Sequence, residues 1–143
     1  MEDIKYTIRY ATTHDMNYVF SSWRKSLKAK TKRYRKYLPW GMYNQWFQSY
    51  AQNRLNQGYK ILIACNPEDL EQIYSFIIYR PQSPPIIEYL YTKSIYQGLG
   101  IARALLKRTG IKDNKILTTT ITDEIKPNKY NIVYLPLPEE YHV

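Results

Sequence analysis

The residues with the clearest chemical potential are two glycines, Gly98 and Gly100, which stand between a strand-like and a helix-like stretch. Residues 88–92 are rich in aromatic and branched side chains, and apolar residues recur with helical spacing from Ile101 onward. Glycine adopts backbone conformations that other residues avoid, so such a turn can point several N–H groups at one spot, at the positive end of a helix. Backbone N–H groups in this arrangement bind anions, most often phosphate. The stretch therefore predicts a phosphate site.

Two common phosphate-binding patterns do not fit this turn. The dinucleotide-binding pattern G-x-G-x-x-G would need a glycine where the chain has Arg103, and no Gly-Lys-Ser/Thr follows as in a P-loop. Residues 97–102 (QGLGIA) instead resemble the signature Arg/Gln-x-x-Gly-x-Gly/Ala of the GCN5-related N-acetyltransferases. In that family the turn holds the pyrophosphate of acetyl-CoA, so the resemblance implies acetyl-CoA as co-substrate.

The resemblance also implies which residues bind acetyl-CoA. The pyrophosphate would meet backbone N–H groups of the turn, and the pantetheine would lie beside the preceding strand as though it extended the sheet. A backbone N–H of that strand would polarise the thioester carbonyl. The cofactor-binding residues expected on this basis are Leu90, Tyr91, Thr92, Gln97, Gly98, Leu99, Gly100, Ile101 and Ala102.

Acetyl transfer to an amine also needs proton-transfer groups. A lysine-like amine with a pKa of roughly 10.4 is neutral in only about one molecule in a thousand at pH 7, so a base is useful. Glu88 is the acid on the central strand and the candidate base; some family members carry a glutamate on this strand two residues earlier, on the same sheet face. The alternative is that Glu88 pairs with a neighbouring basic residue on the surface of the sheet. Tyr130, like Tyr134, lies in the region of the family's general acid, and Tyr130 is the candidate for that role.

These residues must be positioned by the surrounding elements, which the pattern of apolar residues predicts. The order is strand, two helices, three strands, helix and two strands, which is the order found in the family. It predicts an α/β (α+β) fold with a mixed, mostly antiparallel central sheet flanked by helices. Residues 8–12 (IRYAT) also resemble the family's opening strand. The predicted strands are residues 6–10, 59–65, 72–79, 86–92, 115–122 and 132–135. The first predicted helix follows a cap at Thr12 or Thr13 and has Asp15 in its first turn, and the other two begin at Met42 and Ile101.

The C-terminal part is expected to be shortened. The family has a further helix after the strand at 115–122, but here only residues 123–131, with Pro127 among them, separate the last two strands.

Length and composition indicate one folded domain spanning residues 1–143. The chain is 44% hydrophobic, and no run approaches the roughly 18 apolar residues of a membrane span. The first residues lack the apolar stretch of a secretory signal, and the single cysteine, Cys65, can form no internal disulfide. We therefore expect a cytoplasmic protein in which Cys65 is a core residue. No spacing of His and Cys suggests a metal site.

The charge is concentrated in one segment. The net charge is +9, and Arg24–Lys36 holds eight of the 21 basic residues and no acidic one. Aromatic residues accompany it at Trp23, Tyr34, Tyr37 and Trp40. The segment is either a solvated helix tail and loop, a nucleic-acid surface, or an attractive site for an acidic protein or for CoA itself.

Two functional hypotheses follow. The first is an acetyl-CoA-dependent N-acetyltransferase that transfers acetyl directly to a primary amine, without a covalent enzyme intermediate. Its acceptor is unidentified, but a cationic rim disfavours a polyamine and favours an acidic protein or a nucleic acid. The alternative is a catalytically inactive module of the same fold that grips nucleic acid or an acidic protein through residues 23–40.

Overall fold

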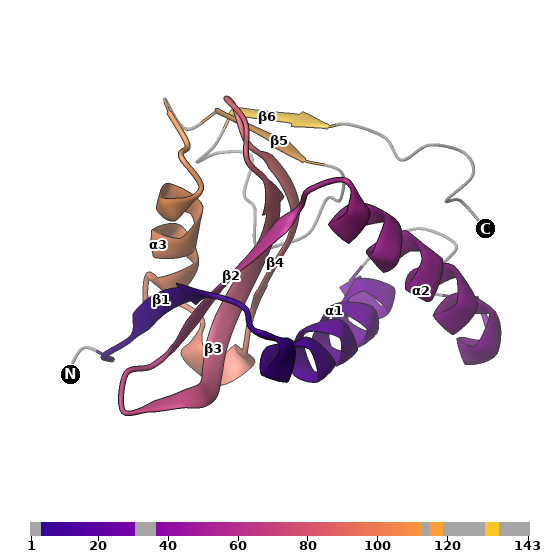
Figure 1. Ribbon diagram of the computed structural model, residues 1–143, viewed down its shortest axis with the longest axis horizontal. Coiled ribbons are helices and arrows are strands. Elements are labelled where there is room, and N and C mark those ends of the chain that lie inside the picture. The colour runs from indigo at the N-terminus through magenta and orange to yellow at the C-terminus, as the bar shows by residue number, and fades with distance from the viewer. Residues whose placement is uncertain (1–3, 31–36, 113–114, 119–130, 135–143) are drawn as a thin grey trace.

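The protein folds around one six-stranded sheet (Figure 1). A computed structural model describes residues 4–30, 37–112 and 115–118, and the backbone of residues 131–134. The strands are β1 (Thr7–Tyr10), β2 (Lys60–Asn66), β3 (Asp69–Arg80), β4 (Ile86–Thr92), β5 (Lys115–Thr118) and β6 (Asn131–Tyr134). The helices are α1 (Met16–Lys30), α2 (Trp40–Asn56) and α3 (Ile101–Arg108), with short 3-10 turns η1 (Thr13–Asp15) and η3 (Ser94–Tyr96).

The strands lie in the sheet in the order of the sequence, from β1 to β6. The pairs β1–β2, β2–β3 and β3–β4 are antiparallel, whereas β4–β5 and β5–β6 are parallel. The mixed, mostly antiparallel sheet expected from the sequence is thereby confirmed, as is the antiparallel hairpin of β2 and β3. Predicted residues 119–122 and 135 of the last two strands, and the segment around Pro127, lie outside the described residues.

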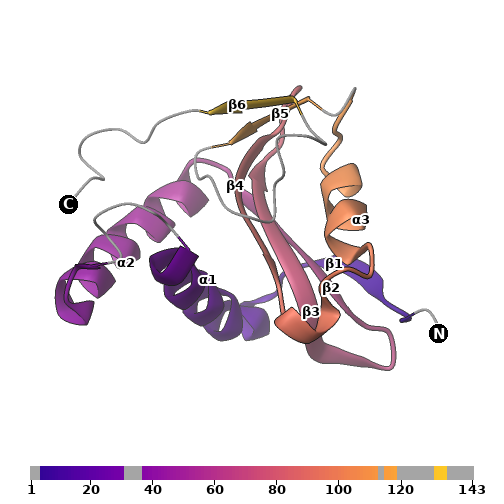
Figure 2. The same cartoon turned by 180° about the vertical axis from the view of Figure 1, so that it is seen from behind.

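Helices cover both faces of the sheet, which gives three layers (Figures 1 and 2). Helices α1 and α2 lie against one face, where Trp23 and Leu27 are buried with the aromatic side chains of α2. Helix α3 lies against the other face through Ile101, Leu105 and Leu106. Both amphipathic stripes follow the apolar spacing of the sequence, since side chains three and four residues apart share one helix face.

Element ends depart slightly from the sequence prediction. Helix α2 begins at Trp40 rather than Met42, because the carbonyl of Pro39 accepts a hydrogen bond from the Tyr43 N–H at 3.0 Å. Strand β3 begins at Asp69, since its pairing with β2 continues through two register shifts to Asn66. Within the described residues, no helix is long and apolar enough to cross a membrane.

Candidate functional site

The glycine turn lies where β4 has ended and α3 begins. Gly98 and Gly100 have φ values of 78° and 82°, in the left-handed region that glycine tolerates best. Gly100 is the residue preceding the first turn of α3, and its carbonyl accepts the helical hydrogen bond of Ala104 at 3.1 Å. The first N–H groups of a helix have no partner within the helix, so those of α3 point out of its N-terminus toward the turn. The predicted anion-binding geometry is thus present in the backbone.

The turn is open rather than packed. Residues Gln97 to Gly100 are exposed, and a Cβ added to either glycine would meet no heavy atom of the described part of the chain within 4 Å. The glycines are therefore required by their backbone conformation, not by crowding. Below the turn, Ile101 is fully buried and anchors α3, while Leu99 is 42% exposed. A solvent-accessible surface of backbone N–H groups on a buried support fits a phosphate ligand.

Gln97 connects the turn to the end of β4. Its side-chain amide donates to the Thr92 carbonyl at 3.2 Å. The Thr92 hydroxyl lies 2.9 Å from that of Ser75 on β3, and the Ser75 hydroxyl donates to the Tyr91 carbonyl at 2.6 Å. The end of the strand and the turn are thereby held in a fixed relation. A ligand that contacts both would meet a preorganised surface.

The edge of β4 is only partly used in pairing with β5. The parallel register joins Ile86 to Leu117 and Ile87 to Thr118, where β5 ends. The later part of β4, including the predicted Leu90, Tyr91 and Thr92, extends beyond this register toward the turn. Among the described residues, none of β5 pairs with that part. An extended chain molecule could lie along this edge and reach the turn.

Glu88 is the extra residue of a β-bulge. Tyr79 pairs with Ile87 and Ile78 with Tyr89, so that Glu88 has no counterpart on β3. Its side chain is fully buried, and Oε2 lies 3.4 Å from Nε of Arg54 on α2. Glu88 is thus paired with a basic residue, but the prediction of a pair on the sheet surface is wrong, because the partner belongs to α2 and both side chains are buried. The structure also places this carboxylate beside the point where the β4–β5 register ends.

Arg54 is enclosed by aromatic rings. Its guanidinium carbon lies 5.2 Å from the ring centre of Tyr50 and 5.7 Å from that of Tyr59, and Nη1 donates to Gln57 at 3.2 Å. The arginine side chain is 5% exposed. The Arg54 cation offsets part of the cost of burying the Glu88 carboxylate, and the two rings add cation–π attraction to Arg54. Glu88 and Arg54 therefore form a buried ion pair beside the β-bulge of β4.

Sequence reasoning did not single out Arg54, although a signal was present. Arg54 is the one charged residue of α2, and it follows Tyr43, Phe47 and Tyr50 at helical spacing on the buried stripe. A charge on an apolar helix face needs a buried partner. Glu88, the one acid on β4, was the residue available to supply it.

Hydroxyl groups line the contact between α1 and β4. The Tyr89 hydroxyl donates to the Ser26 hydroxyl at 2.7 Å, and burial raises the pKa of Tyr89. Burial also raises the pKa of Tyr18 to about 12. Both phenols are therefore neutral near pH 7. They add polarity without charge to the α1 side of β4.

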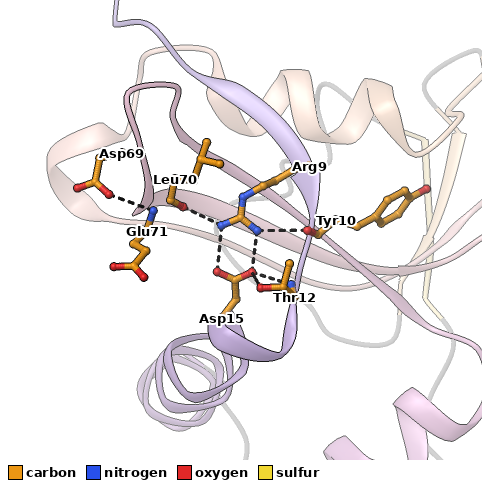
Figure 3. A network of polar contacts seen from close by, with 7 residues as sticks. All are labelled: Arg9, Tyr10, Thr12, Asp15, Asp69, Leu70 and Glu71. Atoms are coloured by element: carbon orange, nitrogen blue, oxygen red, sulfur yellow. Dashed lines mark hydrogen bonds and ion pairs between the residues drawn. The ribbon is translucent and has the colours of Figure 1, made fainter.

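A second polar network fixes the start of α1 (Figure 3). The Arg9 guanidinium donates two hydrogen bonds to Asp15, at 2.7 and 3.0 Å, and one to the Leu70 carbonyl at 2.7 Å. Asp15 also accepts the backbone N–H of Thr12 at 2.7 Å. These bonds lower the pKa of Asp15 to about 2, chiefly through Arg9. They join β1, the turn η1 and the start of β3, so the resemblance seen in residues 8–12 corresponds to a structural junction.

The basic segment requires one correction. Trp23 is fully buried against the rings of Phe47 and Tyr50, so it cannot stack on an external ligand. It belongs to the apolar stripe of α1, which it completes. Tyr37 and Trp40 are 81% and 50% exposed. Tyr34, with residues 31–36, and the candidate acid Tyr130 lie outside the described residues.

Two further kinds of functional group were considered from the sequence, the single cysteine and possible metal ligands. Cys65 is buried and free, as expected. The described residues contain no group of three or more His, Cys, Asp or Glu side chains that could hold a metal ion. The predicted turn residues and the predicted strand residues do meet at one end of β4, whereas Glu88 lies toward the other end.

Comparison with known proteins finds similarity in structure but not in sequence. No family model and no curated protein matches the sequence. A Pyrococcus furiosus protein assigned as an acetyltransferase is similar with a TM-score of 0.64 and 18% identity, over 83% of this chain and 85% of that chain. A predicted acetyltransferase from Clostridium acetobutylicum, solved with acetyl-CoA, has a TM-score of 0.57 and 20% identity, over 96% of this chain and 99% of that chain.

A third similar structure is the PaiA N-acetyltransferase of Thermoplasma acidophilum in complex with coenzyme A. Its TM-score is 0.53 at 17% identity, over 75% of this chain and 70% of that chain. The chain therefore has the fold of the GCN5-related N-acetyltransferases. The resemblance read from residues 97–102 is confirmed at the level of the fold.

Proposed function

We propose that this protein is an acetyl-CoA-dependent N-acetyltransferase that acetylates a primary amine. The observation that carries the proposal is the exposed turn of Gly98 and Gly100 at the N-terminus of α3. The turn η3 connects it to strand β4, whose later edge lies outside the register with the described residues of β5. The turn is suited to bind phosphate groups, and the edge of β4 is suited to bind an extended pantetheine. The coenzyme complexes of two proteins of this fold support the same ligand.

Each part of the site has a separate task in this proposal. The turn residues Gln97 to Ala102 would hold the pyrophosphate by their backbone N–H groups. Residues Leu90 to Thr92 would align the pantetheine, and a backbone N–H near the bulge would polarise the carbonyl. Acetyl-CoA supplies an activated thioester. The chain contributes position and electrostatics, since its one cysteine is fully buried and offers no nucleophile at the surface.

The transfer itself is a direct displacement. The amine nitrogen forms a bond to the acetyl carbon, the carbon–sulfur bond breaks, and a proton leaves the nitrogen while the thiolate gains one. Glu88 is the proposed base, acting through water because its side chain is fully buried. Tyr130 is the proposed acid from its place in the sequence. A cytoplasmic location is part of the proposal and is supported by the single free cysteine.

The role of Glu88 is separable from its pairing with Arg54. If Glu88 is the base, Glu88→Gln lowers kcat about a hundredfold or more and leaves the affinity for acetyl-CoA unchanged. If it serves the ion pair alone, kcat follows the fraction of folded protein. Measuring kcat beside a urea denaturation curve distinguishes the two roles. An unchanged kcat in the folded variant would remove Glu88 from the mechanism.

Acetyl transfer is tested directly by the release of CoA thiol. The acceptors to compare are a peptide with a free N-terminus, a lysine-containing peptide and an amine carried on a nucleic acid. We expect thiol release that requires an acceptor, with the acetyl group found on the amine by mass spectrometry. Failure of the folded protein to bind acetyl-CoA at all would overturn the proposal.

A further inference from the structure

The whole net charge of the protein lies in one stretch of the chain. Met16–Pro67 contains ten basic residues and no acidic one, while the remainder contains 11 basic and 12 acidic residues. This stretch comprises α1, α2 and β2. Of the described residues in this stretch, Arg24, Lys25, Lys28 and Lys30 lie on α1, which together with α2 covers one face of the sheet (Figures 1 and 2), so that layer carries these four positive charges. Such a layer attracts a polyanion.

Two cations of α1 are held against an aromatic ring of α2. The Lys28 ammonium lies 5.1 Å from the ring centre of Trp40, and the Arg24 guanidinium carbon lies 5.8 Å from it. Arg24 also donates to the Asn44 side chain at 2.8 Å. Lys25, which follows Arg24 in the sequence, is exposed. We name these residues, with Tyr37, the cation–aromatic edge.

The edge exposes large rings as well as charge. Tyr37 is 81% exposed, Trp40 50% and the nearby Met42 51%. Single exposed apolar residues are ordinary, but three within six positions, beside fixed cations, mark a binding surface. Charge alone would suit any polyanion. Exposed aromatic rings beside positive charges favour a polyanion with planar groups on which the rings can stack.

We propose that the cation–aromatic edge binds single-stranded nucleic acid. Arg24 and Lys25 would contact phosphates, and the rings of Trp40 and Tyr37 would stack on unpaired bases. An acidic peptide would match the charge but offers no bases for the two exposed rings to stack on. In a duplex the bases are already stacked on one another and are not available to the rings. The binding does not depend on acetyl transfer, so its test succeeds or fails separately from that of the proposed function.

The test is the fluorescence anisotropy of a labelled 20-nucleotide single strand of mixed sequence, titrated with the full chain between 50 and 300 mM salt. We expect affinity that falls steeply with salt. Arg24→Gln/Lys25→Gln should lower the slope of log affinity against log salt by about 2. Trp40→Ala should weaken binding about fivefold or more, and Trp40→Phe should restore most of it.

A matched double variant controls for net charge. Lys107→Gln/Lys112→Gln removes two exposed positive charges in and beyond α3, on the other side of the sheet, and should change the slope little. Circular dichroism and thermal unfolding establish that each variant is folded. Equal losses from both double variants, duplex binding as tight as single-strand binding, or equal binding of poly-glutamate would overturn the proposal. Each of these results would show a general attraction for polyanions.

Discussion

The two faces of the sheet are covered by different kinds of side chain. Among the described residues, the buried cluster under α3 is mostly aliphatic, with two aromatic residues among 11, whereas eight of the 17 buried residues under α1 and α2 are aromatic. Buried on the first are the aliphatic residues Leu62, Ala64, Ile77, Ile87, Leu90, Ile101, Leu105, Leu106 and Ile116, together with Tyr74 and Tyr79. Buried on the second are Trp23, Tyr43, Trp46, Phe47, Tyr50, Tyr59 and Tyr89. Aliphatic side chains bring no polar atoms into a core, and tyrosine and tryptophan always do.

The difference separates two tasks. On the aliphatic side, packing holds α3 in place, and the proposed ligand contacts come from the backbone of the glycine turn. On the aromatic side, rings enclose the Glu88–Arg54 pair and the hydroxyls along β4. We therefore expect changes in the glycine turn before α3 to affect coenzyme affinity, and changes on the α1–α2 side to affect chemistry and to cost more stability than comparable changes in the core under α3.

The largest effect is expected for Trp23→Ala. Trp23 is fully buried and lies within 6.4 Å, centre to centre, of the rings of Phe20, Phe47, Tyr50 and Tyr89. Its removal should cost about 3–5 kcal/mol of unfolding free energy. Leu105→Ala, on the aliphatic side, should cost about 2–4 kcal/mol. Urea denaturation measures both, and a larger loss for Leu105→Ala would reverse the comparison.

A similar loss is expected when the buried ion pair is broken. Arg54→Met leaves the Glu88 carboxylate buried without its cation and should cost about 3–5 kcal/mol. Arg54→Met/Glu88→Gln removes both charges and should be more stable than the single variant. The comparison is made by urea denaturation at pH 7. If the double variant is no more stable than Arg54→Met, the pair is not the source of the effect.

A smaller, pH-dependent effect is expected at the start of α1. Asp15→Asn should cost on the order of 1–2 kcal/mol at pH 7, because the pKa of Asp15 is lowered from 3.8 to about 2 by its bonds to Arg9 and Thr12. A lowered pKa means that the carboxylate stabilises the folded protein above about pH 4. This contribution is lost as the pH falls toward 2.

The difference in stability between the wild type and Asp15→Asn should therefore shrink between pH 4 and pH 2. Asp69→Asn is the matched control, since Asp69 is exposed and accepts one backbone hydrogen bond, from Glu71. A difference for Asp15→Asn that is the same at pH 7 and pH 2.5 would contradict the role given to its carboxylate.

Local pattern predicted most of the architecture. The order of the elements, the β2–β3 hairpin and the conformation of the glycine turn all depend on periodicity and on glycine, which act over a few residues. Trp23 shows that nearness in sequence to the basic segment does not predict exposure to a ligand. It stands beside the basic segment, yet its helical spacing from Val19 and Leu27 places it in the core.

Long-range features were beyond the sequence. The bulge at Glu88 depends on the register of β4 against β3, and the Glu88–Arg54 pair depends on how α2 crosses the sheet. The bulge leaves no local signal, because register is decided by packing across the whole sheet. The pair leaves only a partial one, since a charge on the apolar face of α2 shows that Arg54 needs a buried partner but does not identify that partner. The proposed roles of Glu88 and Tyr130, and the binding of acetyl-CoA, remain for experiment.

The most direct test of the central claim is calorimetric titration of acetyl-CoA into the wild type, Gly100→Asp and Gly110→Asp. Both glycines have positive φ, 82° and 91°, and both have open space around them, so the two variants carry the same backbone strain and the same added charge. Gly100 precedes α3, however, and Gly110 follows it. We predict micromolar binding that Gly100→Asp loses and Gly110→Asp keeps. Equal affinity in all three folded proteins, or no binding by the wild type, would contradict the assignment of the turn as the acetyl-CoA site.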